Sequence, residues 1–206
     1  MEKKLIKVVF ICGVSGGGKD YIAGKLCDNN HLRSLDVNFH NLKQSTTRSP
    51  RSEDEHERYN FLSKEELLKK IYKDEMFAIT HFNNTWYGTE LSNLVKNEEN
   101  NTINIAIVNT LGYMNGRNIL NMLNDSEDHE YKYEYILIRI IPSEIFEKRE
   151  GRDEEFLENE KMQLDVFLNY EVDLFIKNEY EDVFSRRQFM QYTDKIQETF
   201  KMKYNN

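Results

Sequence analysis

Residues 4–20 read KLIKVVFICGVSGGGKD, and the pattern G-x-x-x-x-G-K runs from Gly13 to Lys19. The run before the glycines is apolar and rich in β-branched residues, which predicts a strand that is buried on both faces. After the glycines, the apolar side chains of residues 21–27 keep helical spacing. A strand, a glycine loop and a helix in this order form the context that a phosphate-binding loop requires.

The glycine loop carries the chemistry expected of a site for a bound triphosphate. Glycines let successive backbone N–H groups turn toward one anion, and the start of the following helix adds partial positive charge. We expect Lys19 to reach the β- and γ-phosphates. Asp20 replaces the hydroxyl that normally helps to hold Mg²⁺, and its carboxylate is a candidate metal ligand. A turn that only packs the helix on the sheet is the weaker alternative. The candidate triphosphate-binding residues of this loop are Gly13, Ser15, Gly16, Gly17, Gly18, Lys19 and Asp20.

Further apolar runs alternate with helical patterns along the rest of the chain. The predicted strands are residues 4–12, 104–108, 135–141 and 172–176, and the predicted helices are residues 21–27, 119–123, 143–149, 156–170 and 181–203. Alternating strands and helices indicate an α/β fold with a mainly parallel central sheet. Residues 35–94 do not follow this alternation. They contain a predicted helix at 64–72 and short strands at 76–82 and 85–87, so we interpret them as a small inserted lobe.

The charge balance limits what this protein can bind. The 206 residues include 28 Lys+Arg and 36 Asp+Glu, for a formal net charge of −8. This acidic surplus argues against nucleic acid or an anionic membrane as a partner, because binding either requires basic side chains that neutralise phosphates. Two cysteines cannot form a disulfide framework, and no apolar run approaches roughly 18 residues. We therefore expect a cytoplasmic protein whose phosphate chemistry is confined to a local site.

A second candidate phosphate site lies at residues 46–51, which read TTRSPR. Arg48 and Arg51 stand three residues apart around a proline that restricts the turn, and guanidinium groups suit bidentate recognition of phosphate. A bare R-x-x-R in a charged loop is more often simply solvated. Here acidic residues follow, and then Tyr59 and Phe61 in the sequence YNF.

These motifs, with residues 86–89 (WYGT), 150–152 (EGR) and 176–178 (IKN), resemble those of the guanylate kinase family in order and spacing over residues 4–200. The resemblance implies a P-loop three-layer fold with a parallel central sheet, an inserted lobe that binds a nucleoside monophosphate, and a lid. It also implies ATP and Mg²⁺ as cofactors. We assign residues 1–34 and 95–206 to the P-loop core, including a lid at about 149–165, and residues 35–94 to the lobe.

The resemblance also implies a role for individual side chains. Arg48, Arg51, Tyr59 and Tyr87 would hold the acceptor phosphate. Arg152, with Lys148 or Arg149, would close over the transferring group as part of the lid, and Asn178 would lie near the adenine of ATP. The implied catalytic residues are Lys19, Arg48 and Arg152. Phosphoryl transfer depends mostly on positioning and charge stabilisation, so cations on both sides of the γ-phosphate are what the chemistry requires.

The resemblance fails at the positions that would read the base. Where the family has a glutamate that accepts from guanine, this chain has Ala78, and an upstream serine is replaced by Gln44. Losing an ionic hydrogen bond costs guanine recognition about 1.5–3 kcal/mol, which is enough to change the preferred base. Gln44 and His81 are polar candidates near the vacated position, although His81 is better interpreted as an ordinary strand residue. The implied acceptor-binding residues are Gln44, Arg48, Arg51, Tyr59, Ala78, Tyr87 and Thr89.

Two other features depart from the family pattern. The strand at 103–109 normally ends in carboxylates, but Ile107 and Asn109 occupy those positions, and Asp20 is a hypothetical replacement for one of them. The loop after Arg51 is one residue shorter than usual, so either Glu53 or Asp54 could be its acidic residue.

Two functions remain open from the sequence. The leading interpretation is an ATP-dependent nucleoside monophosphate kinase that phosphorylates GMP, dGMP or another (d)NMP to the diphosphate. The alternative is a catalytically degenerate guanylate-kinase-like binding module, which the lost carboxylates favour. The retained Lys19, Arg48 and Arg51 favour the enzyme, because a pure scaffold has no physical need for them. We expect small-molecule nucleotides as partners and a monomer or homodimer.

Overall fold

A five-stranded parallel sheet forms the centre of the computed structural model, in the order β2-β7-β1-β8-β9. Its strands are β1 (Lys4–Cys12), β2 (Asn38–Asn41), β7 (Thr102–Ile107), β8 (Tyr131–Pro142) and β9 (Leu174–Asn178). The structure describes residues 3–28, 37–82, 84–95, 101–142, 158, 162, 165, 171–178 and 186–204. None of the helices in these ranges is long and apolar enough to cross a membrane.

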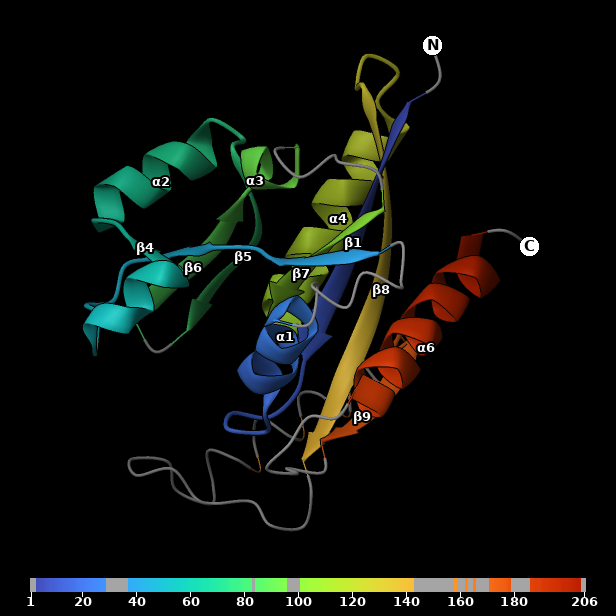
Figure 1. Cartoon of the computed structure of the whole chain (residues 1–206). Coiled ribbons are helices and arrows are strands. Elements are labelled where there is room, and N and C mark those ends of the chain that lie inside the picture. Colours follow the sequence, from blue (N-terminus) through green and yellow to red (C-terminus); the bar gives the residue numbers. More distant parts are fainter. Residues whose placement is uncertain are drawn as a thin grey trace.

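Helices cover both faces of this sheet (Figure 1). The helix α4 (Thr110–Asp125) lies on one face, and α1 (Lys19–Asp28) and α6 (Arg186–Tyr204) lie on the other. Alternate residues of β1 face opposite layers: Phe10 joins the buried cluster that includes α4, whereas Val9 joins the cluster of α1 and α6. Burial on both faces explains why β1 lacks polar alternation, and it confirms the three-layer α/β fold.

A second sheet forms a separate lobe beside the core, with the strand order β4-β3-β6-β5. Its elements are β3 (Gln44–Thr46), the short 3₁₀ helix η1 (Glu53–Glu57), β4 (Tyr59–Phe61), α2 (Lys64–Tyr72), β5 (Met76–Phe82) and β6 (Thr85–Glu90), followed by α3 (Leu91–Val95). Within the range 35–94, β2 pairs with β7 in the core sheet, so the lobe's own sheet begins only at Gln44.

Most predicted elements of the described chain are present, with shifts at their ends. The strands at 4–12 and 76–82 and the helix at 64–72 have the expected bounds. The helix α4 starts nine residues earlier than its apolar pattern indicated, because the Asn109 side chain accepts from Gly112 N at 2.8 Å and caps it. The strand β8 starts four residues earlier, and β9 runs over 174–178 instead of 172–176. The predicted helix at 143–149 lies outside the described residues. So do most of the helix at 156–170 and of the lid.

The lobe contacts the core where β5 crosses α4. Ala78 has a positive φ of 52° at an irregularity in the pairing of β5 with β6, and it is buried. The backbone N–H of Ile79 donates to Asn115 Oδ1 at 2.8 Å. Glycine at 116 permits the close approach, since a Cβ there would lie 2.9 Å from Phe10 Cε1 and 3.3 Å from Ala78 Cβ.

Two glycine substitutions should therefore have opposite effects on stability. Gly116→Ala is expected to lower the free energy of unfolding by about 1–3 kcal/mol, because the buried Phe10 ring cannot move aside. Gly24→Ala, in α1, adds a Cβ with nothing within 4 Å and should raise stability by about 0.5–1 kcal/mol. Urea denaturation of both variants measures the difference. Equal effects would contradict the packing argument.

Candidate active site

The phosphate loop connects the end of β1 to the start of α1. Gly13, Gly16 and Gly18 have φ values of 150°, 81° and 93°, which side chains disfavour. A Cβ on Gly13 would lie only 2.7 Å from the carbonyl oxygen of Ile140. The glycines are thus required by backbone conformation and close packing, as expected of a loop whose N–H groups turn toward one anion.

Two side chains hold this loop in place. Lys19 Nζ donates to the carbonyl oxygens of Gly13 and Val14 at 2.8 and 2.9 Å, so its ammonium group lies across the loop. Asn178 is buried at the end of β9, and its Nδ2 donates to Gly17 O at 3.3 Å. This hydrogen bond joins the end of β9 to the phosphate loop. The predicted contact of Asn178 with adenine stays a prediction.

The arginine loop is organised around Glu55. Arg48 Nη1 and Nη2 donate to the two Glu55 carboxylate oxygens at 2.7 and 2.8 Å, and Nη1 also donates to Ser49 O at 3.0 Å. The backbone N–H of Arg51 donates to the same carboxylate at 2.7 Å. Arg48 also forms a side-chain hydrogen bond with Tyr59. A planar guanidinium group that is held by a carboxylate on one side can bind a second anion through another of its edges.

Four other predicted acceptor residues lie on one face of the lobe sheet: Gln44, Tyr59, Tyr87 and Thr89. The Arg48 guanidinium lies over the rings of Tyr59 and Phe61, at 4.8 and 5.5 Å from their centroids. Side chains that lie directly opposite one another on neighbouring strands point to the same face of a sheet. One row of opposed residues is Tyr59, Gln44 and Thr89, and a second row is Phe61, Thr46 and Tyr87. These two rows are about 7 Å apart, since they are two residues apart along each strand. Burial raises the pKa of Tyr59, which stays a neutral hydroxyl.

An ion pair brings the two loops together. Arg58, which immediately precedes Tyr59, has its Nη1 3.9 Å from Asp20 Oδ1 at the start of α1. Both side chains are about half exposed, at 52% and 51%, so the pair contributes little to stability. Its importance is geometric, because it places the arginine loop beside the phosphate loop.

Comparison with known proteins agrees with this arrangement. A family model described as guanylate kinase matches residues 5–202. This chain belongs to the guanylate kinase family. The guanylate kinase of Malacoplasma penetrans is 32% identical over 187 residues, which cover 87% of this chain and 85% of that protein. That of Mycoplasma capricolum is 40% identical over 87 residues, which cover 40% of this chain and 27% of that protein. The crystal structure of guanylate kinase from Anaplasma phagocytophilum has a TM-score of 0.58 at 18% identity, over 98% of this chain and 88% of that chain, and it supports the fold.

The structure adds two residues that the sequence motifs do not indicate. Arg48 pairs with the carboxylate of Glu55, which lies in η1. Arg58 reaches Asp20 beside the phosphate loop. Arg149, Arg152 and Lys148 lie outside the described residues, so their lid roles stay predictions.

The positions that the resemblance assigns to base recognition do not all lie together. Ala78 is buried, with its Cβ near α4. His81 lies opposite Trp86, outside the row that contains Gln44, and the two ring centroids are 4.7 Å apart. Gln44 Nε2 donates to Ile107 O at 2.6 Å, bridging the lobe and the core sheet. His81 is thus the ordinary strand residue that its position favoured.

Magnesium would need oxygen atoms from a bound nucleotide. Within the described residues, no group of three or more His, Cys, Asp and Glu side chains could hold a metal ion. Asp20 is exposed beside the phosphate loop, and Mg²⁺ commonly combines one or two carboxylates with substrate phosphates and water. A single carboxylate at this place therefore fits the ion, and the role of Asp20 stays a prediction.

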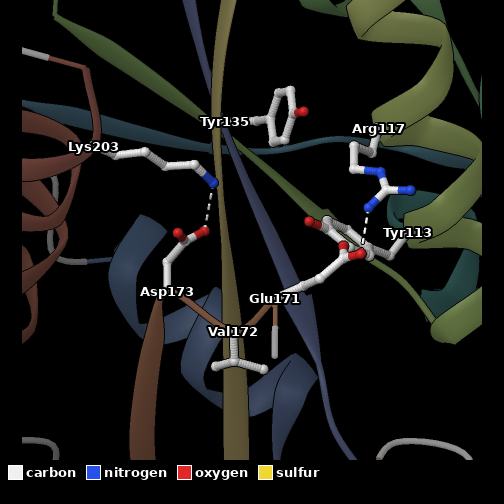
Figure 2. A pocket seen from close by; sticks show the side chains of 7 residues that line it. All are labelled: Tyr113, Arg117, Tyr135, Glu171, Val172, Asp173 and Lys203. Atoms are coloured by element: carbon white, nitrogen blue, oxygen red, sulfur yellow. Dashed lines mark hydrogen bonds and ion pairs between the residues drawn. The ribbon is translucent and has the colours of Figure 1, made fainter. Parts of the chain in front are cut away.

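A cavity of about 300 Å³ lies elsewhere, between α4, the residues before β9 and the end of α6 (Figure 2). Its charged groups pair with one another: Arg117 with Glu171, and Lys203 with Asp173 at 2.8 Å. Asp173 Oδ2 also accepts from Leu137 N at 2.8 Å. None of the predicted site residues lines this cavity. Its polar groups link the helices to the sheet edge.

The pair of Arg48 and Glu55 should make stability depend on pH. The Arg48 hydrogen bonds lower the pKa of Glu55 to about 2, from an ordinary value of 4.5. Because the folded-state pKa is the lower one, the stabilisation is complete above about pH 4.5 and is lost as the pH falls toward 2. Urea denaturation between pH 7 and 3 should show a steeper loss for the wild type than for Glu55→Gln, by about 1–2 kcal/mol. The exposed neighbour variant Glu57→Gln should follow the wild type. Parallel curves for wild type and Glu55→Gln would refute the pairing.

Proposed function

We propose that this protein is an ATP-dependent nucleoside monophosphate kinase that transfers the γ-phosphoryl group of ATP to a (d)NMP. The observation that carries the proposal is the contact between the two loops. Asp20 Oδ1, in the first turn of α1, lies 3.9 Å from Arg58 Nη1. Arg58 precedes Tyr59, whose ring packs against the Arg48 guanidinium group. A donor phosphate chain on the glycine loop would therefore face an acceptor phosphate on the arginine loop.

In this proposal the side chains act by position and charge. Lys19 would leave the loop carbonyls and follow the developing charge on the transferring phosphoryl group. Arg48 would bind the acceptor phosphate while Glu55 holds its guanidinium group in place, and the hydroxyls of Tyr59 and Tyr87 would donate to phosphate oxygens. Such fixed charges stabilise a transition state without reorganising during the reaction.

The residues present fit ATP and Mg²⁺. The positive φ values of Gly13, Gly16 and Gly18 suit a loop that turns its N–H groups toward phosphates, and the Asp20 carboxylate is accessible beside it. Asp20 would hold Mg²⁺, which would supply positive charge to offset that of the phosphates. The retained Lys19 and Arg48 speak against the binding-module alternative, as does membership of a family of phosphotransferases.

A coupled assay of ADP release tests the proposal, with the full chain, ATP and Mg²⁺, and each of AMP, GMP, CMP, UMP and the four deoxynucleoside monophosphates. ADP release must depend on the monophosphate, since release without it reports only hydrolysis. Turnover with at least one acceptor is the expected result. No turnover with any acceptor would overturn the proposal. Isothermal titration with ATP and Mg²⁺ then separates a binding module, which should bind ATP weakly or not at all, from an inactive kinase.

A further inference from the structure

Asp20 places a negative charge at the edge of the phosphate loop. It lies in the first turn of α1, one residue after Lys19, and its side chain is half exposed. A carboxylate at this position repels the phosphates of a nucleotide bound on the loop, because like charges that lie close together raise the energy of the complex. A counter-ion beside Asp20 therefore favours nucleotide binding.

The two cations expected closest to the phosphates have partners other than Asp20. The Lys19 ammonium group donates to two carbonyl oxygens of the loop, at 2.8 and 2.9 Å. The Arg48 guanidinium group binds both carboxylate oxygens of Glu55, at 2.7 and 2.8 Å. Arg58 is the cation that the structure places against Asp20, with 3.9 Å between Nη1 and Oδ1.

The backbone of Arg58 is fixed, whereas its side chain is held only by Asp20. The Arg58 N–H donates to Glu55 O at 3.0 Å, and its carbonyl oxygen accepts from Gln44 N at 3.1 Å, where η1 ends and β4 begins. Among the residues that the structure describes, the guanidinium group has no second ion-pair partner. An ion pair between two half-exposed side chains is weak, so Arg58 and Asp20 can exchange partners at little cost.

The charge of Asp20 also acts on the acceptor side of the site. Burial raises the pKa of Tyr59, and the negative charge of Asp20 raises it further. Tyr59 follows Arg58 directly in the chain, and its ring packs against the Arg48 guanidinium group. Asp20 and Arg58 thus lie between the proposed donor and acceptor sites, where the phosphate charges of the two substrates come closest.

We propose that Arg58 is a positioning residue for the Asp20 carboxylate, and that Asp20 exchanges Arg58 for Mg²⁺ when a metal-bound nucleotide occupies the loop. Without the metal, Arg58 offsets the negative charge of Asp20 and so allows the phosphates to approach. With the metal, Asp20 has a partner of higher charge, and Arg58 is released from it. The inference rests on the proposed kinase function and adds Arg58 to the residues of that same site.

Titration calorimetry with ATP tests this exchange without relying on turnover. The Kd of ATP is measured in EDTA and again in excess Mg²⁺, and the ratio of the two values gives the gain in affinity from the metal. Arg58→Gln is expected to raise this ratio about three- to tenfold, because the unpaired Asp20 repels metal-free ATP, whereas Mg²⁺ still offsets its charge. Arg58→Lys should keep the ratio within about twofold of the wild type, since it restores a cation beside the carboxylate.

A second background assigns the effect to Asp20. When Arg58→Gln is made in an Asp20→Ser protein, the ratio should change by less than about twofold, because serine needs no counter-ion. Arg187→Gln, on the exposed side of α6, makes the same exchange far from the loop and should leave the ratio unchanged. Thermal unfolding checks that each variant is folded. An unchanged ratio in Arg58→Gln would overturn the inference, and so would an equal rise in both backgrounds, because Arg58 would then act on the phosphates without Asp20.

The outcome is separate from that of the turnover assay. If the wild type binds ATP but phosphorylates no monophosphate, the kinase proposal fails, and the Kd ratios still decide the role of Arg58. Binding of ATP only in the presence of Mg²⁺ would overturn the inference alone, because Arg58 would then not offset the charge of Asp20. If ATP binds under neither condition, both proposals are overturned.

Discussion

Lys19→Met is expected to lower kcat about a thousandfold while changing the KM of the monophosphate little. The side chain already lies over the loop, within 2.8 and 2.9 Å of two carbonyl oxygens, so it needs only a change of partner to follow the phosphates. Methionine keeps the length and removes the charge. Since charge on the transferring group grows in the transition state, the loss should appear in kcat more than in binding. Steady-state kinetics with both substrates varied measures the two effects.

The same exchange on the same helix provides the control. Lys25→Met lies in the last turn of α1, with its ammonium group 5.7 Å from the centroid of the Tyr21 ring, away from the loop carbonyls that Lys19 contacts. It should keep nearly full activity. If Lys19→Met were folded and retained more than about a tenth of the wild-type kcat, the role proposed for this lysine would be wrong.

The glycine loop could be predicted from the sequence because the conformation it needs depends on neighbouring residues alone. A strand must be apolar to be buried on both faces, a loop that encloses an anion needs positive φ, and only glycine adopts positive φ without strain. Gly13 and Gly18 meet these requirements in the structure. The parallel sheet followed from the same local patterns. Element ends were less accurate, because the start of α4 depends on the Asn109 cap and not on apolar spacing.

Contacts between segments that lie far apart in the sequence could not be predicted from the sequence. Glu55 is one of several acidic residues in its loop, and only the turn of η1 shows that it is the partner of Arg48. Nothing near Arg58 in the sequence indicates Asp20, which lies 38 positions before it. The resemblance assigned Gln44 to the acceptor site, but the direction of its amide depends on the Ile107 carbonyl of another sheet. Chemistry that depends on orientation therefore required the structure.

The acidic surface and the cationic site have different consequences for binding. A net charge of −8 disfavours long polyanions, yet a mononucleotide meets only the few cations near it. Arg48 is the best placed of the described cations for an acceptor phosphate, because Glu55 and two aromatic rings fix its plane. Its side chain is only 13% exposed, so its orientation is set by the protein and not by solvent.

Arg48→Lys should therefore raise the KM of the monophosphate about a hundredfold, with a smaller effect on kcat. Lysine keeps the positive charge but cannot hold Glu55 and a phosphate at the same time through two edges of one planar group. The loss corresponds to one or two charge-assisted hydrogen bonds. Steady-state kinetics at saturating ATP separates KM from kcat, and Arg187→Lys on the exposed side of α6 is the matched control. A KM within about threefold of the wild type would show that charge alone suffices, and the bidentate geometry seen at Arg48 would then have no part in acceptor binding.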